Sequence, residues 1–142
     1  TARILDVKYF ILLPKPSDVG SELDLHQWGQ ILRSVSAHRA YRWFYKDSGY
    51  KPWLVAEFLI LREEMPRSLV FSYQWINTAL NGLAALHGER YPVHDHAAAT
   101  LQRLRNDKME NIFQSGLHEY VQKFITANVA LSRDIGITYN FP

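Results

Sequence analysis

The chain has 142 residues, enough for one domain, and no cysteine, which excludes disulfides, thiolate catalysis and cysteine-bound zinc. Hydrophobic residues make up 47% and charged residues 21%, a balance typical of a folded globular protein. A net charge of +2 gives nucleic-acid binding little support, and no apolar run reaches the ~18 residues of a membrane span. We therefore expect a cytoplasmic protein with no membrane and no nucleic-acid partner.

The first predicted helix lies at the very start of the chain. Ile4, Leu5, Tyr9 and Leu12 recur at helical spacing, which predicts a helix that runs to about Leu13. No capping residue precedes this pattern, although helices normally begin at one. We interpret the chain as a fragment of a longer protein.

A connector rich in proline and glycine follows at residues 14–21, and further helical patterns come after it. Asp24 is a suitable N-cap for the next helix, in which Trp28 and Val35 share an apolar face. The sequence turns polar at residues 34–36. The stretch that ends before the Asp47 turn is therefore either one bent helix or two short helices.

The most apolar segment spans residues 53–73, and we expect the rest of the chain to pack around it. Proline favours the first turn of a helix, so Pro52 and Pro66 each predict a helix start. The two helices would meet at residues 62–65. The first is apolar nearly all round, as a central helix is.

The helix predicted after Pro66 has two distinct faces. One carries an apolar seam whose steps alternate between four and three residues, the period of left-handed bundle packing. This seam consists of Leu69, Tyr73, Ile76, Leu80 and Leu83. The other face carries Ser72, Ala79 and Gly82, which are small enough for the close approach of a neighbouring helix.

Two more helices complete the predicted fold. The pattern indicates one from about His94 to Arg105 and a last, long one from about Met109 to Tyr139. No alternating strand pattern bounded by hairpin turns occurs. We therefore predict an all-α bundle of about five to seven helices, in which residues 1–142 form a single α-helical domain.

Two groups of histidines match metal sites in part. His118 and Glu119 fit the start of the HExxH zinc motif, but Gln122 stands where the second histidine ligand is required. The second group consists of His87, Glu89, His94 and His96. Side chains two positions apart diverge on a helix, so we predict no metal site there. Motifs for nucleotide binding and serine hydrolysis are also missing, and we expect no cofactor.

Six polar side chains in or beside the apolar segments form the candidate site. They are His38, Arg39, Arg42, Glu57, Glu64 and Arg67. As a ligand site, they would hold a carboxylate or phosphate substrate, with arginine as a bidentate clamp. Alternatively, they pair with one another and fix how the helices cross, or Arg39 and Arg42 lie on a solvated face and cover aromatic rings with their stems. We favour the structural alternatives, because ion pairs are commoner than sites.

Arg67 is the residue on which this cluster depends. Pro66 would place it in the first turn of a helix, where partial positive charge disfavours an unpaired cation. Glu57 would face back across the hinge and Glu64 is three residues away, so either could neutralise Arg67. We predict a buried contact between Arg67 and one of these carboxylates.

Four tracts of the sequence together resemble a known family. They are TARILDVKYFILLP, QILRSVSAHRAYRWFY, VAEFLILREEMPRSLVF and SGLHEYVQKFITANVALSRDI. They are similar to the C-terminal half of the alpha-E domain family, bacterial helical proteins of unknown function, and MPRSL and SVSAHRAYR are the most specific parts. The resemblance implies a longer protein of two related halves, each beginning with a helix like R-Y-L-E-R-A-[DE]-x-T-A-R-x-L-D. Residues 1–6 match only the tail of that helix, and the preceding glutamate, for which the family is named, is absent from this chain.

The resemblance also implies a context. Family members are encoded beside ATP-grasp-type ligases and transglutaminase-like proteins, which suggests a role in peptide- or amide-bond formation. Our leading hypothesis is a non-catalytic helical interaction module that binds such a protein. The alternative is an enzyme or ligand-binding protein whose buried Arg/Glu/His cluster lies at the interface with the missing N-terminal half. An apolar face left open by that missing half would also allow homo-oligomers.

Overall fold

The computed structural model describes residues 1–10 and 16–141, and the regular structure in these ranges is entirely helical. The α-helices are α1 (Ala2–Phe10), α2 (Glu22–Ser34), α3 (His38–Tyr45), α4 (Pro52–Ile60), α5 (Leu69–His87), α6 (Pro92–Asn106), α7 (Met109–Ser115) and α8 (Leu117–Tyr139). Two short 3-10 turns are formed by Pro16–Asp18 and Lys46–Ser48. The all-α prediction is confirmed, and the eight α-helices in the described ranges exceed the five to seven expected.

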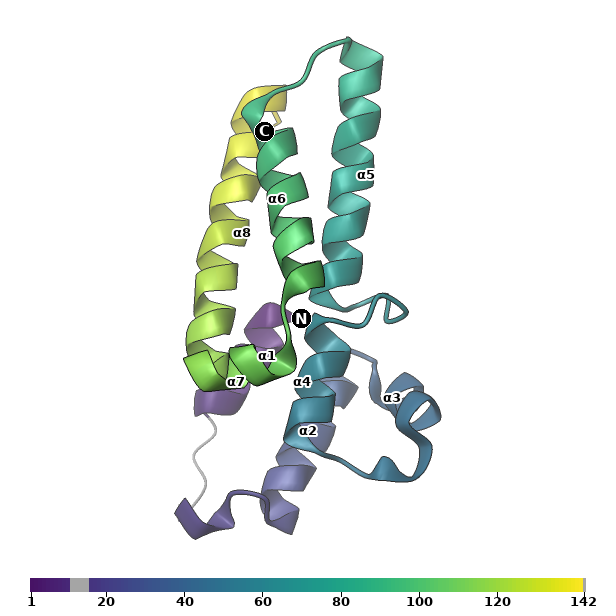
Figure 1. Ribbon diagram of the computed structural model, residues 1–142, viewed down its shortest axis with the longest axis vertical. Coiled ribbons are helices and arrows are strands. Elements are labelled where there is room, and N and C mark those ends of the chain that lie inside the picture. The colour runs from purple at the N-terminus through teal and green to yellow at the C-terminus, as the bar shows by residue number, and fades with distance from the viewer. Residues whose placement is uncertain (11–15, 142) are drawn as a thin grey trace.

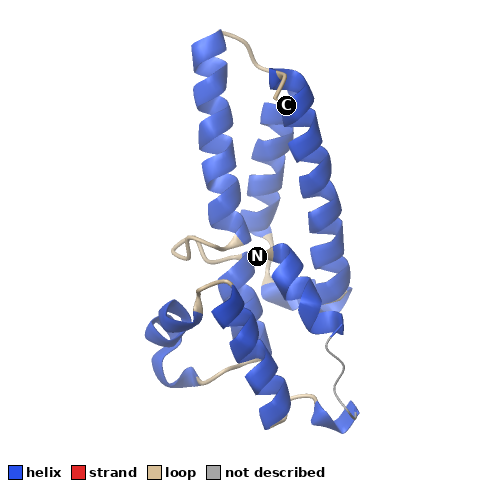
Figure 2. Ribbon diagram, turned by 180° about the vertical axis from the view of Figure 1, so that it is seen from behind, coloured by secondary structure: helices blue, strands red, loops and turns tan. Residues whose placement is uncertain are grey.

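The helices form an elongated molecule with two ends (Figure 1). The long helices α5, α6 and α8 run side by side at one end, and α2, α3 and α4 form the other. Figure 2 shows from behind that α1 lies between the two ends, where it contacts both α8 and α2. None of the helices in the described ranges combines the length and apolar character that crossing a bilayer requires.

One continuous apolar core extends through both ends of the molecule. At its centre, Val55, Leu59 and Ile60 of α4 are fully buried, and α4 packs on α2, α5 and α7. In the long end, Tyr73 of α5 meets Phe124 of α8 with ring centroids 5.4 Å apart. Burial of such side chains supplies most of the free energy that stabilises a helical fold. The expected central helix is confirmed.

The two proline-marked helix starts turn out differently. Pro52 is the first residue of α4, as expected. Pro66, however, lies in a turn, and α5 begins only at Leu69. Ser68 is its N-cap, and its Oγ accepts a hydrogen bond from the amide of Phe71 at 3.1 Å. The serine side chain accepts a hydrogen bond from a free amide of the first helical turn, which a proline side chain cannot do. The fixed φ of proline is also compatible with a turn, so Pro66 does not by itself require a helix start.

A serine cap also replaces the expected cap of α2. Ser21 is the N-cap, and Asp24 is the third residue of the helix. The carboxylate of Asp24 accepts a hydrogen bond from the amide of Gly20 at 2.9 Å, so it supports the helix start from inside the first turn. At the other helix ends, α6 begins at Pro92, slightly before the expected position. The expected end of the first helix near Leu13 lies outside the described residues.

A glycine divides the last predicted helix in two. Gly116 has φ of 92°, a conformation that other residues rarely adopt, so α7 ends before it and α8 begins after it. The prediction of one helix from Met109 to Tyr139 is therefore wrong. The chain also breaks between α2 and α3, where Ser36 has φ of 57°. Of the two alternatives for that region, the one with two separate helices, α2 and α3, is confirmed.

Candidate functional site

Three of the predicted site residues, His38, Arg39 and Arg42, lie together on α3. This helix is amphipathic, because Tyr41 is buried against the core whereas Arg39 and Arg42 are exposed to solvent. The exposed face also carries Trp43, of which 77% is accessible. Of the alternatives, the one in which Arg39 and Arg42 lie on a solvated face is therefore observed, and both project from the surface of the short end of the molecule.

Two further residues join this group. Nε2 of His38 shares a short hydrogen bond with the hydroxyl of Tyr50. The ring of Tyr50 and the guanidinium of Arg33 each lie 3.5 Å from the position that a Cβ would take on Gly29, so both side chains lie beside this residue of α2. Sequence reasoning missed Arg33 and Tyr50, because these contacts cross the break between α2 and α3. We refer to Arg33, Arg39 and Arg42 as the arginine cluster.

Positive charge concentrates around His38. Burial lowers the pKa of this imidazole, and the guanidinium groups of Arg33, Arg42 and Arg39 lower it further. Apart from Asp47, whose side chain lies outside the described part of the structure, no carboxylate forms an ion pair with the arginine cluster. Residues 33–56 carry five of the 16 basic residues of the chain and one of its 14 acidic residues. The modest net charge of the whole chain therefore hides a strongly basic region.

A pocket of about 470 Å³ opens beside the arginine cluster. It is lined by Tyr41, Arg42, Lys46, Gly49 and Tyr50. The hydroxyl of Tyr41 donates to the carbonyl of Gly49 at 2.9 Å, and the rings of Tyr41 and Tyr50 stack with centroids 5.9 Å apart. Two cations and a rigid aromatic wall therefore meet in one concave site, whose volume lies within the range of about 300–1,000 Å³ common for small-molecule sites.

Glu57 belongs to a separate group at the end of α4. Its Oε1 accepts a charge-assisted bond from Nη2 of Arg62 at 2.9 Å, and its Oε2 accepts the hydroxyl of Tyr45 at 3.1 Å. The guanidinium of Arg62 also lies 5.0 Å from the centre of the Phe44 ring. Burial raises the pKa of Tyr45 to about 12. For Glu57, the structural alternative describes what is observed, since the group fastens α3 to α4.

The predicted contact between Arg67 and a carboxylate is wrong. Arg67 and Glu64 are both exposed, and no carboxylate among the described residues forms an ion pair with Arg67. Its backbone carbonyl accepts the hydroxyl of Thr1 at 2.6 Å. The reason is local: Arg67 lies in a turn and not in a helix, while Arg62 is close enough to Glu57 to take the carboxylate. The six predicted site residues thus fall into separate groups.

The outer face of α5 is the second feature of interest. The small residues Ser72, Ala79 and Gly82 do not receive a neighbouring helix as expected, because all three are exposed and nothing lies within 4 Å of where a Cβ on Gly82 would be. Trp75 and Leu86 on the same helix are 63% and 84% exposed. We refer to Trp75, Ala79, Gly82 and Leu86 as the α5 face.

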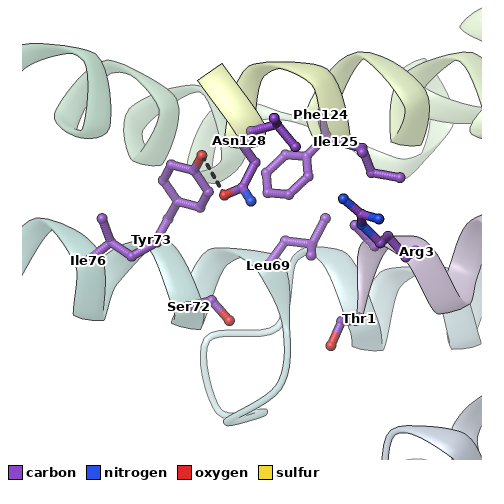
Figure 3. Close-up of a pocket in the computed structure, with 11 residues that line it drawn as sticks. Thr1, Arg3, Leu69, Ser72, Tyr73, Ile76, Phe124, Ile125 and Asn128 are labelled. Carbon is purple, nitrogen blue, oxygen red and sulfur yellow. Dashed lines mark hydrogen bonds between the residues drawn. The ribbon is translucent and has the colours of Figure 1, made fainter. Parts of the chain in front are cut away.

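A smaller pocket of about 280 Å³ lies where α1, α5 and α8 meet (Figure 3). The hydroxyl of Tyr73 donates to Oδ1 of Asn128 at 3.1 Å, so these polar groups satisfy each other across the pocket. Thr1 and Arg3 lie at one end, as Figure 3 shows. The pocket is slightly smaller than usual ligand sites, and its best-placed polar groups are already bonded to each other.

The two histidines of α6, His94 and His96, lie in different environments. His94 is fully buried in α6, where its Nδ1 bonds the backbone amide of Tyr91 at 2.8 Å and its Nε2 bonds the hydroxyl of Tyr139 at 3.0 Å. His96 points to solvent, so the two side chains diverge as predicted. No group of three metal-binding side chains occurs among the described residues.

Asp6 and His118 form a contact that sequence reasoning missed. Oδ1 of Asp6 lies 2.9 Å from Nδ1 of His118, and its Oδ2 accepts a hydrogen bond from Nε2 of Gln122 at 2.6 Å. The ring of Tyr9 stacks on His118 with centroids 3.7 Å apart. Gln122, which replaces the second histidine of the zinc motif, therefore helps to join α8 to α1. No local signal could reveal it, because 112 positions separate Asp6 and His118.

Comparison with known proteins gives one match. Residues 1–139 match the model of the family Alpha-E, described as a predicted alpha-helical domain with a conserved ER motif. No curated protein and no solved structure matches the chain. The one Glu-Arg dipeptide in the sequence is Glu89–Arg90, in the turn before α6. There Glu89 accepts the hydroxyl of Tyr91 at 2.7 Å, and Arg90 bonds Asn81 and Asp95, each at 3.1 Å.

Proposed function

The chain belongs to the Alpha-E family of helical domains, and on that premise we propose that it is a non-catalytic interaction module. In this proposal the α5 face binds a partner protein. The partner class is the one that the family resemblance implies, an ATP-grasp-type ligase, with a transglutaminase-like protein as the second choice. The observation that carries the proposal is the chemistry of the α5 face.

The α5 face lacks the charge that a solvent-facing helix normally has. The 19-residue helix LVFSYQWINTALNGLAALH contains no Asp, Glu, Lys or Arg. A surface helix usually presents charged residues on the side opposite the core. Figure 1 places α5 at the edge of the long end, beside α6, so one side of the helix remains uncovered. An uncharged, partly apolar helix side of this kind is typical of a surface that is buried in a complex.

The shape of the α5 face also suits docking. Trp75 and Leu86 mark its two ends, and the small residues Ala79 and Gly82 lie between them. Small residues allow a helix or strand of a partner to approach the backbone closely. Tryptophan is among the residues that most often dominate the energy of an interface, because it fills a pocket with a large rigid surface. We therefore expect Trp75 to contribute more to binding than any other residue of the face.

The histidine contacts support the non-catalytic part of the proposal. His94 joins the start of α6 to α8, and His118 joins α8 to α1 through Asp6. His38 holds the hydroxyl of Tyr50. Each of these imidazoles has an evident structural partner, so none needs a catalytic role to explain its position.

The proposal is tested by co-purification of the chain with an ATP-grasp-type ligase of the kind that the family resemblance implies. Trp75→Ser should weaken the association at least tenfold, because the variant removes the largest exposed apolar side chain of the α5 face. Trp43→Ser is the matched control: Trp43 is similarly exposed but lies on α3, and its replacement should leave binding unchanged.

Two results would contradict the proposal. One is association with neither the ligase nor the transglutaminase-like protein. The other is association that responds equally to the Trp75 and Trp43 variants. Light scattering should accompany the binding experiment, because a dimer that Trp75→Ser dissociates would assign the α5 face to self-association and not to a foreign partner.

A further inference from the structure

We propose that the arginine cluster and the adjoining pocket form a binding site for the phosphate group of a small molecule. The arginine cluster is Arg33, Arg39 and Arg42, and the pocket is the one lined by Lys46 and Tyr50. The site lies on α3 and its neighbours, away from the α5 face, and it does not depend on the proposed partner.

The first argument is that no ion pair is found for the cluster among the described side chains, which do not include that of Asp47. Four arginines elsewhere pair with carboxylates: Arg62 with Glu57, Arg90 with Asp95, Arg105 with Glu63, and Arg133 with Asp134. What distinguishes the three arginines around His38 is that each lies close enough to influence the same imidazole. Like charges held close together repel, and a bound anion would relieve that repulsion.

The second argument is the concavity beside the cluster. Arg42 and Lys46 both line the pocket of about 470 Å³, together with the backbone at Gly49. A nucleic acid or a membrane presents an extended surface and would bind to a flat or protruding patch, whereas a pocket binds a small ligand. The stacked rings of Tyr41 and Tyr50 give the pocket a stiff wall, and the hydrogen bond from His38 fixes Tyr50 in place.

The third argument concerns the charge and number of the donors. A phosphate dianion presents three acceptor oxygens and nearly two negative charges, and it can bind several guanidinium groups at once. A single carboxylate offers two oxygens and one charge, which would leave most of the cluster unneutralised. The donors present therefore match phosphate better than carboxylate.

Pyrophosphate is the probe for this site. We expect it to bind saturably to the full chain in isothermal titration calorimetry at physiological ionic strength, and to shift the NMR amide signals of Gly49 and Tyr50. Arg42→Gln should weaken binding at least tenfold. Arg42 is exposed, so its replacement should not disturb folding, which circular dichroism would verify. Arg133→Gln on α8 is the matched control and should change affinity less than twofold.

Other outcomes would overturn the proposal. They are the absence of saturable pyrophosphate binding, binding that Arg42→Gln leaves unchanged, and citrate binding as tightly as pyrophosphate, which would indicate carboxylate chemistry. Tighter binding of a short oligonucleotide, lost in Arg42→Gln, would assign the cluster to nucleic acid. Tyr50→Phe provides a second variant: it removes the hydroxyl that His38 holds, and it should reduce affinity less than Arg42→Gln does.

Discussion

At the scale of single residues, Glu57 forms an ion pair with Arg62 and not with Arg67, and this predicts that loss of Arg62 destabilises the protein more than loss of Arg67. Arg62→Ala should lower the free energy of unfolding by about 1–2 kcal/mol, because it leaves a partly buried carboxylate without its cation and removes a contact with Phe44. Arg67→Ala, which removes an exposed and unpaired side chain, should change it by less than about 0.5 kcal/mol. Urea denaturation of both variants measures the difference.

The same experiment distinguishes this arrangement from the one expected from sequence. A larger loss in Arg67→Ala than in Arg62→Ala would show that Arg67 does neutralise Glu57 in solution. A buried pair between Arg67 and Glu57 would make that loss about 3–5 kcal/mol, the typical cost of breaking such a pair. Since the side chains of Glu57 and Arg62 are 27% and 34% exposed, solvent screens even the observed pair and reduces its contribution.

Buried tyrosines predict a loss of stability at alkaline pH. Burial raises the pKa of Tyr45 from 10.0 to about 12, and it also raises the pKa of Tyr41 and Tyr73. The unfolded chain therefore loses these protons at lower pH than the folded chain does. The resulting stabilisation is complete below pH 10 and disappears as pH rises towards about 12.

This expectation can be measured by urea denaturation at increasing pH, with tyrosinate absorbance to follow ionisation. The free energy of unfolding should remain level up to about pH 10 and then fall. The free energy of unfolding of Tyr45→Phe should fall less steeply with pH than that of the unchanged protein. A decline of equal slope in both proteins would mean that Tyr45 ionises as readily in the folded state as in the unfolded one.

At the scale of elements, the break between α7 and α8 depends on a single backbone conformation. Gly116→Ala should cost about 1–2 kcal/mol, because φ of 92° is strained for any residue with a Cβ and the new methyl would meet the side chain of Glu119. Gly136→Ala is the matched control: it lies inside α8 with open space around it and should stabilise the protein by about 0.5–1 kcal/mol. Thermal unfolding compares them, and equal effects would contradict a special role for Gly116.

Helices were predictable from sequence where a local rule decided the outcome. Apolar spacing located α4, α5 and α6, because one side of each helix must face the core. The positions of the helix ends were harder to predict. Pro66 and Ser68 are both residue types that favour the start of a helix, and only the hydrogen bond to Ser68 shows that α5 begins after the serine. Gly116 is a residue type that favours a helix break, but the apolar spacing continues on both sides of it. An uninterrupted apolar pattern does not exclude a change of direction between two helices.

The candidate site was less predictable because its contacts are not local. The sequence identified His38, Arg39 and Arg42 correctly as neighbours, since they share one short helix. Arg33 and Tyr50 join them only through the way α2, α3 and the following loop fold together. The charge of the region was also hidden, because acidic residues elsewhere in the chain balance it in the total.

At the scale of the whole molecule, α1 connects the two ends. Its Lys8 pairs with Asp24 of α2 at 2.8 Å, and both side chains are largely buried. On the same helix, Asp6 reaches His118 of α8 at 2.9 Å. One short helix therefore makes polar contacts with both the short and the long end. We expect α1 to couple the unfolding of the two ends, in addition to the contacts of α4 with α5 and α7.

Lys8→Ala tests this coupling. Removal of Lys8 leaves the Asp24 carboxylate, which also accepts a hydrogen bond from the amide of Gly20, buried without its cation, so the free energy of unfolding should fall by about 3 kcal/mol. Hydrogen exchange should then show faster exchange for amides of α8 as well as α2, because a loosened α1 also releases its contacts with α8. Lys123→Ala, an exposed position on α8, is the control and should change neither quantity. Faster exchange confined to α2 would mean that the two ends are stable independently, and that α1 is an attachment to the core and not the link between its parts.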